Sequence, residues 1–212
     1  LMHGTENKIG TKKKKEEQDY QIVSEVPYYL DGAGFTNGLR SRLAVWDPKQ
    51  GTVDFLTAPT FAVSGLELNP ETNQVVFWGA DFTRVKEVKD GLYRLDLTTK
   101  TIDCLIEPGL MKISFAHWYG KEILTAMSNG KKYGAGETPK LFLVHPQTKA
   151  LTLFNDNDAT FGNAVGTDCA FGGSAMKKVA GTDFYAVMTD ADHTPLFRFD
   201  SQGRRTEALP FD

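Results

Sequence analysis

The sequence has 212 residues, 41% hydrophobic and 24% charged, which are the proportions of a folded protein and exclude collagen, a coiled coil and a disordered chain. Its 24 Lys and Arg against 27 Asp and Glu give a net charge of −3, too close to balance to predict nucleic-acid binding. No apolar run reaches the roughly 18 residues of a membrane helix, and the polar N-terminal end shows no secretory signal.

The first 18 residues are predicted to be a charged segment that connects structural units. The basic run Lys12–Lys15 is followed directly by Glu16 and Glu17, which weaken its field at physiological salt, so a solvated connection is expected. Because Leu1 precedes Met2, and because the chain ends equally abruptly at Asp212, the sequence is expected to be a piece of a longer protein. Residues 19–212 carry the repeat described next.

Four segments align without a gap, beginning at anchor leucines that are spaced 49, 49 and 55 residues apart. Each anchor opens a short strand pattern, then come four turn-like residues and a second strand that ends in Leu or Phe. Polar and apolar residues alternate in these strands, as they do in a strand with one buried face. The predicted hairpins are Leu43–Leu56, Leu92–Leu105, Leu141–Phe154 and Leu196–Leu209.

The residue before each turn is predicted to form the turn. It is Asp47, Asp96 and Asp200 in three copies and His145 in the other. An Asp side chain at this position accepts hydrogen bonds from the backbone that follows, which starts the turn. This prediction argues against a propeller enzyme that acts on carbohydrate, because such an enzyme needs converging carboxylates at one site.

One further strand is expected before each hairpin, and a second one before the last three hairpins. The nearer strands are Asn73–Trp78, Lys121–Ala126 and Asp183–Met188, with Val26–Leu30 in this position for the first hairpin. The farther strands are Phe61–Leu66, Lys112–His117 and Ser174–Val179. Units of about 50 residues with three or four strands are typical of a β-propeller. The fold class is therefore predicted to be all-β, a partial β-propeller of about four blades. The competing β-sandwich gives no reason for four near-equal repeats.

The aromatic residues and cysteines have structural interpretations. Trp46 and Trp78 lie in strand patterns and are expected to be buried between blades. Trp118, at the end of a strand, could instead face a pocket or the central channel. Cys104 is expected to be a buried small hydrophobe, because Cys104 and Cys169 have no metal-binding or redox spacing.

No catalytic or metal-binding residue is predicted in this chain, and no cofactor is expected. Ser174 lies in the segment closest to a nucleophile elbow, Gly172–Met176, but Met176 stands where the second glycine belongs. The histidines His3, His117, His145 and His193 share no ligand spacing. The acidic runs Asn155–Asp158 and Asp190–Thr194 lack the glycine of a calcium loop and are expected to be polar loops.

The stretch Asp19–Phe35, running into Arg42–Asp47 and Leu56–Thr57, resembles the propeller of S9 serine peptidases. It is most similar to the acylaminoacyl-peptidase branch of this prolyl oligopeptidase-type family, through Pro27–Tyr28, Asp31–Gly34 and the closing Leu56–Thr57. The segment Leu68–Phe77 is similar to the strand pair that recurs in the family, although Asn69 replaces the usual serine.

The resemblance implies a seven-bladed propeller that restricts entry to an α/β-hydrolase domain, which carries the Ser-His-Asp triad. The chain is therefore expected to be a non-catalytic, substrate-gating segment of a peptidase that hydrolyses short or N-acylated peptides. Its expected partners are that hydrolase domain in the same parent chain and the parent's peptide substrates, with no nucleic acid and no membrane. The expected location is the cytoplasm.

A non-enzymatic propeller that serves as a scaffold or protein-binding module is the alternative, because the fold does not determine the function. An incomplete ring also leaves strand edges and apolar faces uncovered. The sequence therefore predicts either self-association through these faces or a compact closure of the four blades.

Overall fold

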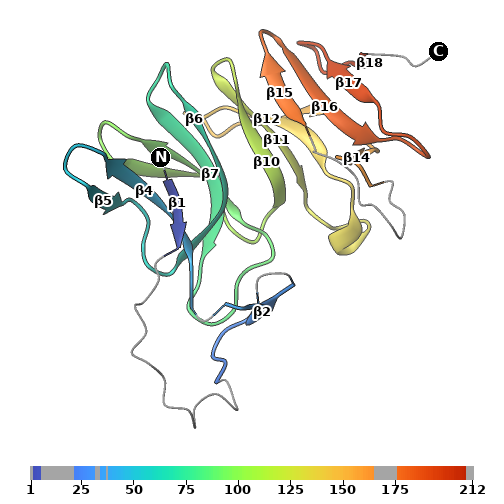
Figure 1. Cartoon of the computed structure of the whole chain (residues 1–212). Helices are drawn as coiled ribbons and strands as arrows, with labels where there is room; N and C mark the ends of the chain where they lie inside the picture. Colours follow the sequence, from blue (N-terminus) through green and yellow to red (C-terminus); the bar gives the residue numbers. More distant parts are fainter. Residues whose placement is uncertain (1, 6–21, 32–33, 37, 165–175, 209–212) are drawn as a thin grey trace.

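A computed structural model describes residues 2–5, 22–31, 34–36, 38–164 and 176–208. In these ranges the chain forms four antiparallel sheets of three or more strands that follow one another in chain order as the blades of an incomplete β-propeller, which confirms the predicted fold class (Figure 1). The first and fourth sheets lie at opposite ends of the row, so the four blades do not close on themselves. None of the described segments is a helix with the length and hydropathy of a membrane span.

The second and third sheets are four-stranded meanders whose strands pair in sequence order. The second consists of β6 (Phe61–Asn69), β7 (Gln74–Asp81), β8 (Gly91–Asp96) and β9 (Thr101–Ile106), and the third of β10 (Lys112–Tyr119), β11 (Glu122–Ser128), β12 (Lys140–Val144) and β13 (Leu151–Asn155). The fourth contains β15 (Lys177–Ala180), β16 (Asp183–Thr189), β17 (Leu196–Phe199) and β18 (Arg205–Glu207), with β14 (Thr160–Phe161) paired to the end of β16. The first contains β1 (Met2–Thr5), β4 (Ser41–Asp47) and β5 (Thr52–Phe55). All four predicted hairpins are present, and only Leu209, at the end of the fourth, lies outside the described residues.

The first sheet corrects two expectations. In this sheet β1 lies next to the first strand of the hairpin, where the other sheets have β7, β11 and β16. β1 pairs antiparallel with β4, although residues 1–18 were expected to be a solvated connection. The prediction that Val26–Leu30 fills this position is wrong, because its last two residues form β2 (Tyr29–Leu30) and pair with β3 (Gly34–Phe35) in a separate small hairpin. A four-residue strand is too short to show a hydrophobic period, so only the tertiary pairing reveals it.

The predicted turn residues form the turns. Asp47 Oδ1 accepts hydrogen bonds at 2.8 and 3.3 Å from the second and third amides after it, and Asp96 Oδ1 does the same at 2.8 and 3.1 Å. Asp200 Oδ1 accepts from the amides of Gln202 and Arg204. His145 fills the same role through Nδ1, which accepts two amides at 3.3 and 3.2 Å. These residues therefore belong to the scaffold.

Lys149, the last residue of the turn in the third hairpin, has a strained backbone conformation that a substitution can relieve. Lys149 has a φ of +59°, whereas the first copy has Gly51 at this position with a φ of +66°. A side chain in this left-handed region costs about 1–2 kcal/mol, partly offset by the greater freedom of glycine in the unfolded chain. Lys149→Gly is therefore expected to raise the free energy of unfolding by up to about 1 kcal/mol, measured by urea denaturation. Gln147→Gly is the matched control, because Gln147 has no positive φ; equal effects of the two substitutions would contradict this explanation.

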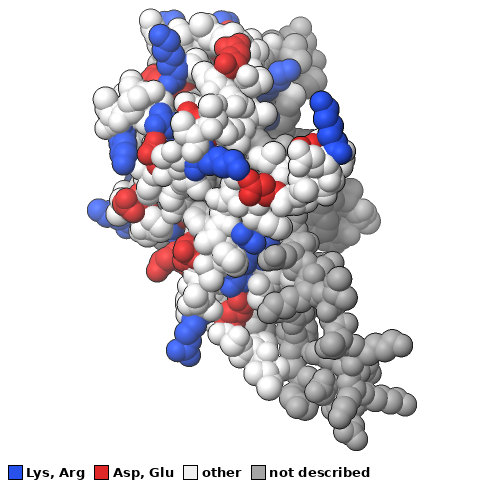
Figure 2. Space-filling model, turned by 90° about the vertical axis from the view of Figure 1, so that its left-hand side faces the viewer, with Lys and Arg blue, Asp and Glu red and all other residues white. Residues whose placement is uncertain are grey.

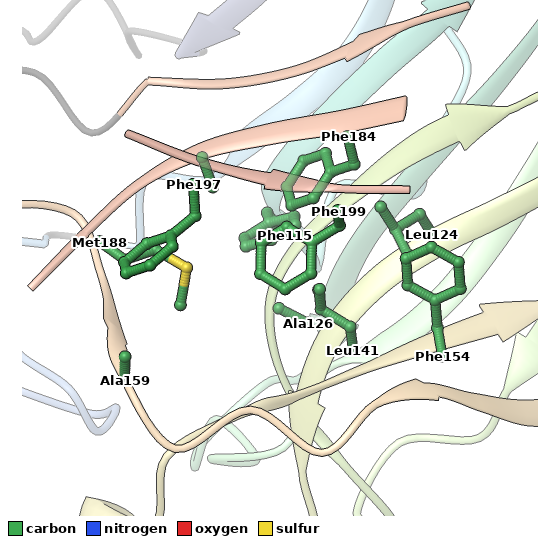
Figure 3. Close-up of a cluster of buried hydrophobic side chains, with 11 residues drawn as sticks. Phe115, Leu124, Ala126, Leu141, Phe154, Ala159, Phe184, Met188, Phe197 and Phe199 are labelled. Atoms are coloured by element: carbon green, nitrogen blue, oxygen red, sulfur yellow. The ribbon is translucent and has the colours of Figure 1, made fainter. Parts of the chain in front are cut away.

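The hydrophobic core lies between the sheets rather than within any one of them. One cluster joins the first and second sheets around Leu43 and Phe77, and another joins the second and third around Leu92 and Ile123. The largest joins the third and fourth sheets, and Figure 3 shows Phe184 and Phe199 of the fourth sheet grouped with side chains of the third. Each sheet therefore depends on its neighbours for burial, as expected of repeat architectures.

The predicted positions of the three tryptophans have different outcomes. Trp78 is partly buried and packs against the clusters on both sides of the third sheet, which confirms its predicted position between blades. Trp118 packs against the cluster between the second and third sheets. The prediction for Trp46 is wrong, because its side chain is 49% exposed. It stands in the first sheet, where no preceding sheet is present among the described residues to cover it.

A buried ion pair fastens the small β2–β3 hairpin. The carboxylate of Glu25 accepts hydrogen bonds from Arg40 at 2.5 and 3.2 Å, from Thr36 Oγ1 at 2.7 Å and from the Gly38 amide at 3.1 Å. Next to it, Val26 forms a parallel bridge with Val85 in the connection between β7 and β8. The hairpin is thereby held against the second sheet.

Candidate functional surface

The longer connections of the second and third sheets lie at one end of the strands. Because neighbouring strands are antiparallel, alternate connections share an end. The connections 82–90, 107–111, 129–139 and 156–159 share one end, and the short hairpin turns share the other. Loops carried on rigid strands are where propellers and other scaffolds place binding functions.

A groove of about 780 Å³ opens at this end of the third sheet, between segments 128–140 and 156–158. Its apolar lining comes from Met111, Met127, Phe142 and Leu153. Its polar rim carries both signs of charge, from Lys131, Lys132, Lys140, Asp156 and Asp158. An apolar floor with a few polar groups at the rim is the usual composition of a ligand-binding cleft.

Glu137 gives one wall of the groove its shape. Its Oε2 accepts hydrogen bonds from the amides of Lys132 at 2.8 Å and Tyr133 at 3.2 Å, and its Oε1 accepts from Ser128 Oγ at 2.7 Å. The bond from Ser128, followed by the backbone amides, lowers the pKa of the Glu137 carboxyl. The carboxylate thus accepts the backbone amides that a neighbouring strand would otherwise accept, and it holds segment 128–137 folded back on itself.

The acidic run that begins like a calcium loop forms the opposite wall. Asp156 pairs with Lys140, and Asp158 lies 3.4 Å from Arg205. The buried Asn157 bonds through both amide atoms to Ala159, at 2.6 and 3.2 Å. The interpretation as a polar loop is confirmed, and within the described ranges no group of three or more His, Cys, Asp or Glu side chains could hold a metal ion.

His117 belongs to a polar contact between the first strands of the second and third sheets. Its Nδ1 lies 3.0 Å from Glu67 Oε2, and the same oxygen accepts the backbone N–H of Trp118 at 2.9 Å. The His117 ring also packs near the rings of Phe115 and Phe184. His117 therefore has a packed and hydrogen-bonded role in the contact between the sheets. Trp118 is not among the residues that line the groove at the third sheet.

A second polar group, which the sequence analysis does not identify, joins Ser64 to the connection 82–90. Ser64 Oγ donates to Asp90 Oδ2 at 2.5 Å and accepts from Lys86 Nζ at 3.2 Å, and Lys86 lies 3.1 Å from the other Asp90 oxygen. Ser64 is the extra residue of a β-bulge in β6. Because Lys86 donates to the serine oxygen instead of accepting its proton, the group serves to hold the connection in place.

Cys104 is unsuited to nucleophilic chemistry. It is half-buried in β9, and its Sγ lies 3.4 Å from the carbonyl oxygen of Ile106. Burial, followed by the neighbouring Glu107, raises the pKa of the thiol to about 11. The reactive form is the thiolate, which is scarce at neutral pH with this pKa.

The remaining candidate residues from the sequence belong to no site in the part of the chain that the structure describes. His193 takes part in a tight turn through backbone bonds with Asp190, so that acidic run is also a polar loop. The side chain of His3, and the residues Lys12–Lys15, Cys169 and Ser174, lie outside what the structure describes. The groove at the third sheet is absent from the sequence prediction; the signal that could have revealed it is the unusual length of the segment between Ser128 and Lys140.

No family model and no curated protein matches the sequence. Among solved structures, the chain is similar to acylaminoacyl peptidase from Pyrococcus horikoshii, with a TM-score of 0.62 and 17% identity over 94% of this chain and 29% of that one. It is also similar to TolB from Acinetobacter baumannii, with a TM-score of 0.52 and 15% identity over 78% of this chain and 37% of that one. An oligogalacturonate lyase in complex with manganese gives a TM-score of 0.51 and 13% identity over 80% and 42%.

These likenesses establish the fold. The chain has the sheet arrangement of a β-propeller, including that of propeller domains in S9 peptidases. It spans less than a third of the peptidase chain and less than half of TolB or the lyase. At these identities the likenesses carry no activity over to this chain.

Proposed function

We propose that the chain is a non-catalytic, substrate-gating propeller segment of an S9-family serine peptidase of the acylaminoacyl-peptidase type. The observation that carries the proposal is the likeness over 94% of the chain to a peptidase of which it spans 29%. The resemblance of Asp19–Thr57 to the propeller of that family supports it independently. A cytoplasmic location and an α/β-hydrolase domain in the same parent chain are part of the proposal.

Under this proposal the segment would act by shape. Sheets that bury their side chains against each other form a stiff wall, which excludes folded proteins from a chamber and admits short peptides. The groove at the third sheet has an apolar floor and rim charges of both signs, which suit the side chains and backbone of an extended peptide. Bond cleavage would be carried out by the triad of the hydrolase domain.

Two measurements test the proposal. The isolated chain should not hydrolyse N-acylated peptide p-nitroanilides, and the coding sequence beyond Asp212 should continue into an α/β-hydrolase with a Gly-x-Ser-x-Gly elbow. In that parent, removing residues 19–212 should increase cleavage of a folded protein relative to cleavage of a short acylated peptide. Serine-peptidase activity of the chain itself, or a different domain in the parent, would overturn the assignment.

A non-enzymatic, protein-binding propeller is the second candidate, because the propeller fold by itself does not determine the function. The same parent sequence separates the two, because the second candidate requires no hydrolase domain. A carbohydrate-acting enzyme is not proposed, because the recurring aspartates Asp47, Asp96 and Asp200 bind the backbone of their own turns.

A further inference from the structure

The two walls of the groove at the third sheet differ in how their charges are compensated. The aspartates of one wall are paired, as described above, with Lys140 and Arg205. On the opposite wall the carboxylate of Glu137 is bonded to amides and a hydroxyl of its own segment. Lys131 and Lys132 on that wall are exposed, and neither has an ion-pair partner among the described residues. The uncompensated charge of the groove is therefore positive and favours an anionic group on a ligand.

This preference for an anion is local and does not come from the charge of the whole molecule. The chain carries a net charge of −3. On the side of the molecule that Figure 2 shows, basic and acidic side chains are scattered among uncharged residues without a continuous patch of either sign. A field of this kind does not draw an anionic ligand from a distance. Recognition has to come from contacts within the groove.

The apolar lining of the groove can accept an apolar side chain. It consists of Met111, Met127, Phe142 and Leu153, and Leu153 is 51% exposed. Methionine side chains are flexible and polarizable, so they adapt to apolar groups of different shapes. The groove volume of about 780 Å³ lies in the range of sites for small ligands. The lining therefore suits a short ligand with an apolar group.

Two polar side chains of the lining favour a peptide over a plain hydrocarbon acid. Asn129 and Thr138 both line the groove. Asn129 Oδ1 accepts the backbone N–H of Lys131 at 3.0 Å, whereas the Asn129 amide nitrogen and the Thr138 hydroxyl make no hydrogen bond within the described part of the chain. A peptide backbone offers such groups both donors and acceptors, and a hydrocarbon chain offers neither.

We propose that the groove binds the carboxyl-terminal end of a short peptide, with an apolar last side chain on the apolar lining and the α-carboxylate beside Lys131 and Lys132. The last side chain and the α-carboxylate of a peptide are attached to the same carbon atom. They therefore match a groove in which two uncompensated cations and an apolar lining occur together.

The inference deepens the proposed function and rests on it, because that function brings short N-acylated peptides to the propeller. The acyl group removes the cation of the amino terminus, so the α-carboxylate is the one free terminus of such a peptide. A groove that holds this terminus would select peptides by their last residue, while the blocked end is left for the hydrolase domain. The substrate class of the groove is therefore a short peptide with a free carboxylate and an apolar last residue.

Isothermal titration calorimetry of the 212-residue chain tests the proposal with four ligands. They are acetyl-Ala-Ala-Leu-Phe with a free carboxylate, the same peptide with a carboxyl-terminal amide, acetyl-Ala-Ala-Ser-Ser with a free carboxylate, and decanoate. The first peptide should bind. The amide should bind about five- to tenfold more weakly, because it loses the attraction of two lysines. The serine-ended peptide and decanoate should also bind more weakly than the first, because one lacks the apolar side chain and the other the peptide backbone.

Substitutions at exposed positions locate the binding. Lys131→Gln and Lys132→Gln should each weaken binding of the free-acid peptide about two- to fivefold and leave binding of the amide unchanged. Lys121→Gln is the matched control, since Lys121 is exposed in the turn at the other end of the third sheet. Leu153→Ser should weaken binding of the phenylalanine-ended peptide. Its control is Leu151→Ser, because Leu151 is 47% exposed on the same strand but does not line the groove.

Each contrary outcome overturns the inference. These outcomes are no binding at millimolar peptide, equal binding of the acid and the amide, equal binding of decanoate or of the serine-ended peptide, and equal effects of Lys131→Gln and Lys121→Gln. Circular dichroism of each variant shows that its sheets remain folded. The proposed function is tested separately by the coding sequence of the parent. A parent without a hydrolase domain would overturn that function whatever the titrations show, whereas absent binding in a chain whose parent has the domain would overturn this inference alone.

Discussion

Replacing Phe184 by alanine is expected to lower the free energy of unfolding by about 3–5 kcal/mol. Phe184 is 0% exposed, and its ring lies 5.8 Å from the ring of Phe115 and 5.7 Å from that of Phe199, measured between centroids. Truncation would remove this packing and leave a cavity between the third and fourth sheets, where neighbours in a dense core relax only partly. Urea denaturation followed by circular dichroism measures the loss.

The matched control is Leu151→Ala. Leu151 is 47% exposed in β13, so its truncation should cost less than about 1 kcal/mol. If Phe184→Ala cost no more than the control, the core would not lie between the sheets. If the variant shows a second, separate transition, the fourth sheet unfolds independently, as is common when a repeat array loses its coupling.

Replacing Glu25 by glutamine is expected to cost about 3 kcal/mol at neutral pH. The side chains of Glu25 and Arg40 are 8% and 7% exposed, so the substitution would leave the buried guanidinium without a counter-charge. We expect the loss to be local, because the pair fastens the β2–β3 hairpin and the Val26–Val85 bridge. Hydrogen exchange of the Val26 and Lys86 amides, which donate to Arg84 and Val26 across this bridge, reports the opening.

The pH dependence follows from the lowered pKa of Glu25. The hydrogen bond from Arg40 is the largest cause; it holds the pKa of the Glu25 carboxyl below its ordinary value of 4.5, against the opposing effect of burial. A carboxyl with a lowered folded pKa stabilises fully above its unfolded pKa, and this contribution is lost as the pH falls through the folded pKa. The difference between the wild type and Glu25→Gln should therefore be constant near neutral pH and shrink in acid, below the unfolded pKa.

An exposed ion pair provides the control for this experiment. Asp54 pairs with Lys100 between the first and second sheets, with side chains 57% and 61% exposed. Asp54→Asn should cost less than about 1 kcal/mol, because solvent screens the pair. A cost for Glu25→Gln as small as this, or one that grows toward acid pH, would show that the buried pair does not fasten the hairpin.

The strand pattern could be predicted where the repeat was informative. Four hairpins and the strands before three of them follow from residues that alternate at equal spacing, because a strand with one buried face must alternate. The role of His145 also followed from its place in the repeat, since a ring nitrogen accepts backbone amides as a carboxylate does. In contrast, β1 is only four residues long and could not be recognised by its period.

The candidate site was less predictable than the strands. The groove depends on Glu137, whose carboxylate accepts two backbone amides and a hydroxyl from residues four to nine positions before it in the sequence. No sequence period reports such a contact, because it depends on how one irregular segment folds back. The same holds for the Ser64 group, which joins a β-bulge to a distant connection.

The sequence by itself determined the all-β class, the number of hairpins and which residues start their turns, since these depend on neighbours within a few positions along the chain. Only the tertiary structure decided which strand completes the first sheet and which repeat-equivalent side chains are covered. Trp46 and Phe199 occupy the same position in two copies of one pattern, yet one is half exposed and the other fully buried. The alternation of a strand determines which way a side chain points, but burial also requires a second sheet on that side.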